Sequence, residues 1–97
     1  MLVKKHKTPD GQLILAVCDD ELLGKQFEEG DKVLDLSGDF FKGEEMNEGT
    51  LDRVIKQAYM ANAIGEKSVK FFTDRKLADN VVTVDGIPNA QLVIIRE

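Results

Sequence analysis

The chain has 97 residues and a mass of 10.8 kDa, which fits a single domain over residues 1–97 and excludes large enzyme folds such as the TIM barrel. Hydrophobic residues at 42% and charged residues at 32% are typical of a globular protein and exclude a disordered tail. The net charge of −5 disfavours direct nucleic-acid binding, because phosphate contacts need a basic surface.

The first eighteen residues predict a β-hairpin. A strand over residues 1–7 leads into Thr8-Pro9-Asp10-Gly11, in which Pro presets φ and Gly accepts a positive φ at the turn exit. Gln12 to Cys18 is apolar almost throughout rather than alternating. Continuous apolarity favours a central strand that is covered on both faces.

The acidity of the chain lies in residues 19–52, where twelve Asp or Glu and three Lys give a net charge of −9. Asp19 to Gly24 predicts a short helical turn, because Asp caps free N–H groups and Gly ends helices. Val33 to Leu36 predicts a short strand, and residues 39–48 an acidic loop with an aromatic anchor. The acids lack calcium-loop spacing, so we expect a solvated acidic surface and assign no metal ligand; a weak Mg²⁺ or Ca²⁺ site is the alternative.

The main helix is expected over residues 50–64. Thr50 is its predicted N-cap, and Gly65 its predicted end. Apolar side chains follow at i, i+3, i+4, i+7 and i+8 from Leu51 to Tyr59, which is the period of a helix with one buried face.

Asn62 is the polar residue of most interest, because in the predicted helix it lies on the same side as Leu51, within the apolar stripe. A buried amide must be hydrogen-bonded or it costs about 1–3 kcal/mol. One interpretation is that Asn62 ties down the helix end. The other is that it lines a pocket at the helix C-terminus, close to Glu66.

The remaining chain predicts a strand over Ser68–Thr73, a short helix or turn over 74–80 with Asp74 as its cap, and a second hairpin. That hairpin joins strands at 81–84 and 90–96 across Asp85-Gly86, a strong hairpin signal. These elements predict an α+β fold. We expect a compact two-layer domain with a mostly antiparallel or mixed sheet of five to six short strands and the 50–64 helix on one face.

Cysteine and histidine are each present once, as Cys18 and His6. One cysteine makes no internal disulfide, so we expect a reducing, cytoplasmic compartment. The acids after Cys18 raise a thiol pKa, which favours an inert buried cysteine, and hairpin counting places His6 away from it. The longest apolar run has six residues, whereas a membrane helix needs about 20. No cofactor motif occurs, so we expect no cofactor.

Four pieces of the sequence, in this order and spacing, resemble a known family. They are Val17-Cys18-Asp19 with Glu21-Leu22-Leu23-Gly24-Lys25, then Phe40-Phe41-Lys42-Gly43, then Ala61-Asn62-Ala63-Ile64-Gly65-Glu66, and finally Gly86-Ile87-Pro88-Asn89-Ala90. The family comprises small archaeal proteins and is known as domain of unknown function four-two-four. The resemblance runs from about Val3 to Ile95.

The resemblance implies an archaeal cytosolic protein with a compact α+β fold and implies no activity. A place in translation or RNA processing is expected of an archaeal housekeeping protein. The chain departs from the family pattern at Phe41, where Tyr is common, and at Asn89, where His is common. A catalytic role of either family residue could not operate in this chain.

Three functions follow as hypotheses. The first is a non-catalytic binding or adaptor module, whose acidic segment docks on a protein or ribonucleoprotein partner. The second is a small enzyme or small-molecule binder with its pocket at the strand and helix junctions. The third is a homo-oligomer that buries an apolar edge. The candidate pocket residues are Cys18, Asp19, Asn62, Gly65 and Glu66. We assign no residue to catalysis or to metal binding.

Overall fold

A computed structural model describes residues 1–94, and within this range the chain forms eight strands, two α-helices and two 3₁₀ turns. The strands are β1 (Leu2–Lys7), β2 (Leu13–Cys18), β3 (Gln26–Glu29), β4 (Lys32–Asp35), β5 (Glu44–Glu45), β6 (Met60–Ile64), β7 (Val82–Val84) and β8 (Ile87–Val93). The helices are α1 (Glu48–Val54) and α2 (Glu66–Asp74), and the 3₁₀ turns are η1 (Asp20–Leu22) and η2 (Ile55–Gln57).

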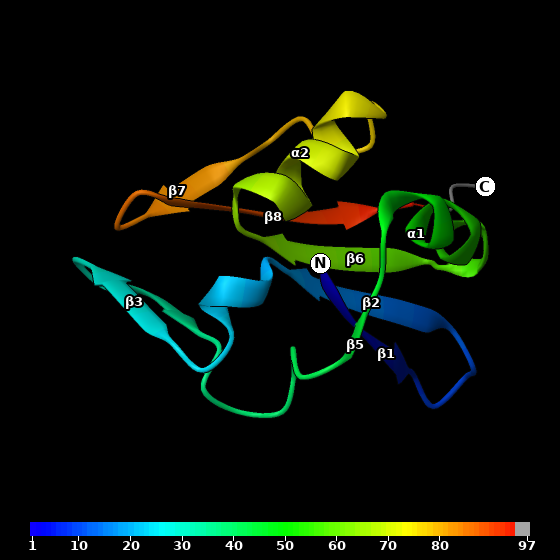
Figure 1. The fold of residues 1–97 in the computed structure, drawn as a ribbon, viewed down its shortest axis with the longest axis horizontal. Helices are drawn as coiled ribbons and strands as arrows, with labels where there is room; N and C mark the ends of the chain where they lie inside the picture. Colours follow the sequence, from blue (N-terminus) through cyan, green and yellow to red (C-terminus); the bar gives the residue numbers. More distant parts are fainter. Residues whose placement is uncertain (95–97) are drawn as a thin grey trace.

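Six of the strands form one mixed sheet in the order β5-β1-β2-β6-β8-β7 (Figure 1). Only β2 and β6 run parallel in this sheet, within the described range, and their neighbours pair antiparallel. β3 and β4 form a separate two-stranded hairpin. The predicted α+β fold with a mixed sheet of short strands is confirmed.

The two faces of the six-stranded sheet are covered differently, because side chains alternate along each strand. One face, here called the helix face, carries the main core under α1 and α2. This core includes Leu15, Val17, Leu51, Ala61, Ala63, Phe72 and Leu92. The other face, here called the hairpin face, is covered by η1, the β3–β4 hairpin and the segment after it. Its smaller core is Ala16, Cys18, Leu22, Leu36, Phe41 and Ile64.

The N-terminal hairpin forms as predicted. Gly11 has φ +87°, and its N–H donates to the Thr8 carbonyl at 2.9 Å. β2 lies in the interior of the sheet, and Leu15 to Cys18 are fully buried on both faces. The continuous apolar run therefore marks a central strand, as expected.

The helix predicted over 50–64 is wrong in its second half. α1 ends at Val54, η2 adds one turn, and Met60–Ile64 is the interior strand β6. Its N-cap is Asn47 rather than Thr50, since the Asn47 side chain accepts a 2.8 Å hydrogen bond from the Thr50 N–H. β6 gains hydrogen bonds from both β2 and β8, and these two ladders outweigh a weak local helical preference.

The strand predicted over Ser68–Thr73 is also wrong, because these residues lie in α2. Ser68, Val69, Phe71 and Phe72 are buried, while Lys70 between the two pairs is exposed, which is a helical pattern. Asp74 is the last residue of this helix and not the cap of another. The aromatic and β-branched residues of this segment favour a strand locally, but a helix allows them to be buried together against the sheet.

The C-terminal hairpin is confirmed with a tighter turn than expected. Asp85 and Gly86 have φ +51° and +77°, which fits a two-residue turn. β8 therefore begins at Ile87 rather than at Ala90, and residues 95 and 96 of the predicted strand lie outside the described residues.

The acidic segment follows the prediction in part. η1 and β4 form where a helical turn and a short strand were expected. Glu44–Glu45, however, pairs with β1 as an edge strand rather than lying in a loop. No helix among residues 1–94 is long and apolar enough to cross a membrane.

Candidate functional site

The ends of the parallel strands β2 and β6 bring two of the predicted pocket segments together. Cys18 pairs with Ile64, and the Asp19 N–H donates to the Ile64 carbonyl at 3.1 Å. Asp19 and Gly65 therefore lie side by side, each directly after the C-terminal end of one of these two parallel strands. We call Asp19, Gly65 and the first turn of α2 the strand-end junction.

Asp19 is engaged in holding this junction. Its carboxylate accepts hydrogen bonds from the Lys67 N–H at 3.1 Å, the Ser68 N–H at 2.8 Å and the Ser68 hydroxyl at 2.8 Å. Asp19 is only 3% exposed. The free N–H groups of a helix start need an acceptor, and a carboxylate also suits the positive end of the helix dipole. Asp19 thus caps α2 from another part of the chain.

Gly65 stands at the N-cap position of α2, where it has no side chain to serve as a cap. Its φ of +112° favours glycine. A Cβ atom at this position would lie 2.4 Å from Cγ of Asp19. The absence of a side chain at Gly65 is therefore what admits the Asp19 carboxylate to the helix start.

Cys18 is fully buried on the hairpin face next to this junction. Burial raises the pKa of its thiol to about 11, and the negative charges of Asp19 and Asp20 add to the rise. The thiolate is the nucleophile in cysteine chemistry, so a protonated, inaccessible thiol is unsuited to it. Glu66 is exposed as the first residue of α2.

Asn62 lies away from the junction, in a hollow on the hairpin face. It pairs with Ala16 on one side and with Gln91 on the other. The hollow has a volume of about 320 Å³. We call it the amide groove, and its principal lining residues are Asn62, Asn89 and Gln91 from the sheet and Val33, Leu34, Phe40 and Phe41 from the covering segments.

The three side-chain amides of the groove differ in their hydrogen bonding within the protein. The Asn89 side chain donates to the Val82 carbonyl at 2.9 Å. Among the described residues, the side chains of Asn62 and Gln91 have no hydrogen-bond partner, and they sit opposite each other on adjacent strands. Residues 62 and 91 thus present two free amides beside apolar walls. The sequence predicted a pocket role for Asn62 from the wrong element and missed Gln91 and Phe40.

Phe40 closes one side of the groove and is held by His6. The two rings stack with centroids 4.3 Å apart, and His6 Nε2 lies 2.9 Å from the Phe40 carbonyl oxygen. Phe40 nevertheless stays 47% exposed. His6 therefore orients a groove residue and lies far along β1 from the register partner of Cys18, which is Leu2.

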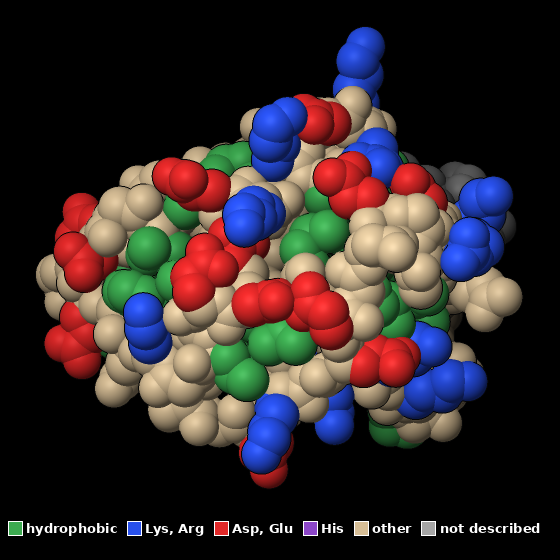
Figure 2. Space-filling view, viewed as in Figure 1, with side chains coloured by type: hydrophobic (Ala, Val, Ile, Leu, Met, Phe, Trp, Pro, Cys, Tyr) green, Lys and Arg blue, Asp and Glu red, His purple; other side chains and the backbone are tan. Residues whose placement is uncertain are grey.

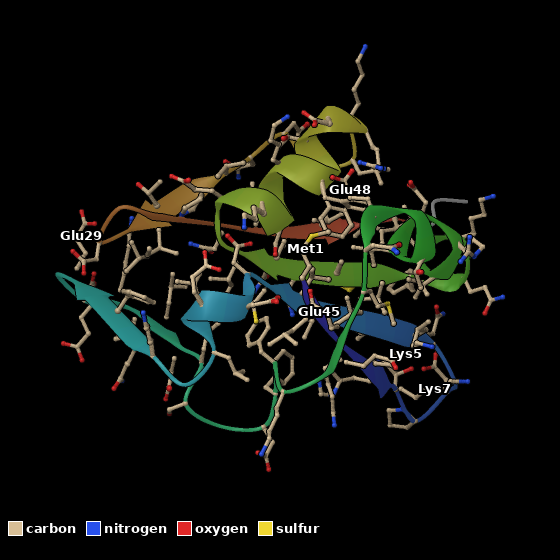
Figure 3. The ribbon with its side chains drawn as sticks, in the orientation of Figure 1. Met1, Lys5, Lys7, Glu29, Glu45 and Glu48 are labelled. Atoms are coloured by element: carbon tan, nitrogen blue, oxygen red, sulfur yellow. The ribbon has the colours of Figure 1, made fainter. Side chains whose placement is uncertain are left out.

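Acidic side chains gather in a band across the middle of the molecular face shown in Figure 2. Near this band the Met1 ammonium lies 2.9 Å from Glu45 and 3.2 Å from Asp20 (Figure 3). Burial lowers the pKa of this ammonium, but the hydrogen bonds to Glu45 and Asp20 outweigh that effect and raise it. Within residues 1–94, no three His, Cys, Asp or Glu side chains are placed to hold a metal ion.

Comparisons with known proteins agree with this architecture. The model of a family described as "Protein of unknown function (DUF424)" matches residues 6–95. A crystal structure of an uncharacterized conserved protein from Methanopyrus kandleri is similar, with a TM-score of 0.79 and 27% identity over 99% of this chain and 93% of that chain. No curated protein matches the chain.

Proposed function

The chain belongs to the DUF424 family, and we propose that it is a non-catalytic binding module that engages a protein partner through the amide groove. The observation that carries this proposal is the pair of free amides at Asn62 and Gln91 beside the exposed ring of Phe40. Aromatic side chains are enriched at protein interfaces, and hydrogen bonds from a partner can satisfy the two amides there.

The side chains that could act as nucleophile, acid or base support a role without catalysis. The Cys18 thiol is buried and protonated at neutral pH, and Asp19 is committed to the start of α2. His6 is packed on Phe40. A catalytic site needs a nucleophile or base within reach of a bound substrate. The groove lining instead consists of amides, apolar side chains and Asp35.

The expected partner carries a basic protein surface. Residues 19–52 have a net charge of −9, and Asp35 of this segment lines the groove. Complementary charge speeds association and selects partners. A ribonucleoprotein of translation or RNA processing in an archaeal cytosol offers such a surface, and the Methanopyrus kandleri relative fits an archaeal source.

Affinity capture from native cell extract, with and without nuclease, tests this function. Asn62→Leu keeps the side-chain size and removes both polar groups, and Gln57→Leu makes the same kind of change on exposed η2. We expect a partner protein that survives nuclease and binds the Gln57→Leu variant, with at least about tenfold less recovery by Asn62→Leu. Recovery of the protein alone in every sample contradicts the proposal, as does capture that nuclease abolishes.

A second candidate function is small-molecule binding in the same groove. Its volume of about 320 Å³ lies within the usual range of ligand pockets. A planar ligand with hydrogen-bonding edges would suit Asn62 and Gln91, with Phe40 beside it. Thermal unfolding with a set of nucleosides and amino acids tests this candidate. A shift in the wild-type Tm that Asn62→Leu abolishes favours it over a protein partner.

A further inference from the structure

Strand β8 extends well beyond its edge partner β7. β7 pairs with β8 only at Val82 with Asn89, Thr83 with Pro88, and Val84 with Ile87. Within the described residues, no strand pairs with residues 90–93 on that side. Figure 1 shows β7 diverging from β8 on its way back to α2. Half of β8 is therefore an unpaired sheet edge.

The register shows which backbone groups this edge presents. The Gly65 N–H donates to the Pro88 carbonyl, and the Ile94 N–H donates to the Tyr59 carbonyl, so these positions of β8 face β6. Hydrogen bonding alternates along an antiparallel strand. Ala90 and Leu92 therefore also face β6. The N–H and C=O groups of Gln91 and Val93 point the other way, toward the unpaired edge.

Two hollows lie along this edge and form what we call the β8 edge groove. They have volumes of about 380 Å³ and 310 Å³, and they meet at Asn80 and Gln91. One wall is the connection from Leu77 to Asn80 with Val82, and the other is Asn89–Val93. Val82 is 40% exposed at the mouth. The edge is thus open to solvent rather than covered.

The lining of the groove indicates the chemistry of what it binds. Leu77, Ala78 and Leu92 belong to or pack against the core of the helix face and offer an apolar surface. Asp79 is the charged side chain of the lining. The unpaired N–H and C=O groups recur at every second residue of β8, which is the spacing at which an extended peptide backbone forms hydrogen bonds with a strand.

We propose that the β8 edge groove binds an extended segment of a partner protein as an added β-strand. The segment's backbone bonds to Gln91 and Val93, one apolar side chain rests on Leu77 and Leu92, and a Lys or Arg lies near Asp79. Strand addition to an open sheet edge is a recurring mode of peptide recognition. The proposal rests on the proposed function, since it supplies the binding mode of the protein partner. The two grooves adjoin along β8, because Asn89, Ala90 and Gln91 line both.

The shape of the groove favours a peptide over a second copy of this chain. The connection at 77–80 borders the edge along its length. A second β8 would bring its own bordering connection into the same narrow space. A single extended segment brings no such neighbour.

Selection from a random linear heptapeptide library displayed on phage tests the proposal on the full chain. Three variants separate the contributions. Val93→Ala removes only side-chain atoms and keeps the N–H, while Gln91→Pro and Val93→Pro each remove a backbone donor that β8 does not use toward β6. We expect enriched peptides with an apolar residue beside a basic one. Binding to Val93→Ala should fall less than about threefold, and binding to each proline variant at least about tenfold.

The other possible results separate the failure of strand addition from the failure of the proposed binding function. Enriched peptides that bind the proline variants as well as the wild type refute strand addition but leave the proposed binding function standing. Failure to enrich any peptide refutes strand addition as well, and the nuclease-resistant capture then decides the binding function alone. A molecular mass that doubles with concentration in the wild type but not in Gln91→Pro assigns the edge to a second copy and refutes the peptide. A retained unfolding transition in Val93→Pro shows that loss of binding is not loss of fold.

Discussion

The strand-end junction and the β8 edge groove lie on the same sheet and differ in how their polar groups are satisfied. At the junction, one buried carboxylate accepts three hydrogen bonds across almost fifty residues of sequence. At the edge, the backbones of Gln91 and Val93 face no strand within the described residues. Polar groups that hold a fold are satisfied internally, whereas free ones are available to a partner. The residues that look most reactive in the sequence therefore have structural roles.

Loss of the Asp19 carboxylate should have the largest effect. Asp19→Ala leaves the Lys67 and Ser68 donors of a buried helix start without their acceptor. We expect a loss of about 3 kcal/mol in the free energy of unfolding, measured by urea denaturation. Asp20→Ala is the matched control, because the Asp20 side chain is exposed and pairs with the Met1 ammonium at the surface; its loss should stay below about 1 kcal/mol. Equal losses would contradict a special role of Asp19.

The Cys18 thiol should react far more slowly than a free cysteine. Its pKa of about 11 lies two units above the ordinary value of 9.0, so the thiolate fraction at pH 8 falls about a hundredfold. Labelling with a thiol-disulfide reagent should be at least that much slower than with a cysteine peptide, and faster as pH rises toward 11. A rate at pH 8 equal to that of the peptide would show an accessible, ionised thiol.

Replacement of Gly65 should destabilise the junction by steric contact. Gly65→Ala puts a Cβ atom 2.4 Å from Asp19 Cγ at φ +112°. We expect a loss of about 2 kcal/mol in unfolding free energy. Gly24→Ala is the control, since Gly24 also has a positive φ of +86° but meets nothing within 4 Å; its loss should be about 1 kcal/mol. The difference isolates the contact with Asp19.

Changes at the free amides should hardly affect stability. Gln91→Ala removes an exposed side chain that has no partner among residues 1–94. Its unfolding free energy should lie within about 0.5 kcal/mol of the wild type. A loss above about 1.5 kcal/mol would show that the amide contributes to the fold and is not held ready for a partner.

The sequence predicted those parts of the fold whose signals are local. Thr8-Pro9-Asp10-Gly11 and Asp85-Gly86 gave both hairpins of the sheet, because turn chemistry is set by the turn residues themselves. β6 was missed because its partners come from residues 14–18 and 89–93, far away in sequence. α2 was missed because its cap, Asp19, lies in another segment.

The candidate site was predictable only in part, and for the same reason. Asn62 drew notice as a polar residue among apolar ones, although the helix assigned to it is a strand. Gln91 carried a usable signal, since it alternates with Ala90 and Leu92 as an exposed residue in a strand does. No local signal shows that β7 ends short of it, because that follows from how two segments diverge in space.

Residue-resolved amide hydrogen exchange of the free protein tests the open β8 edge most directly. Ala90 and Leu92 donate toward β6, whereas Gln91 and Val93 face the unpaired edge. We expect Gln91 and Val93 to exchange at least about a hundredfold faster than Ala90 and Leu92 under native conditions. Equal, strong protection of all four amides would show that the edge is already paired and would contradict the account.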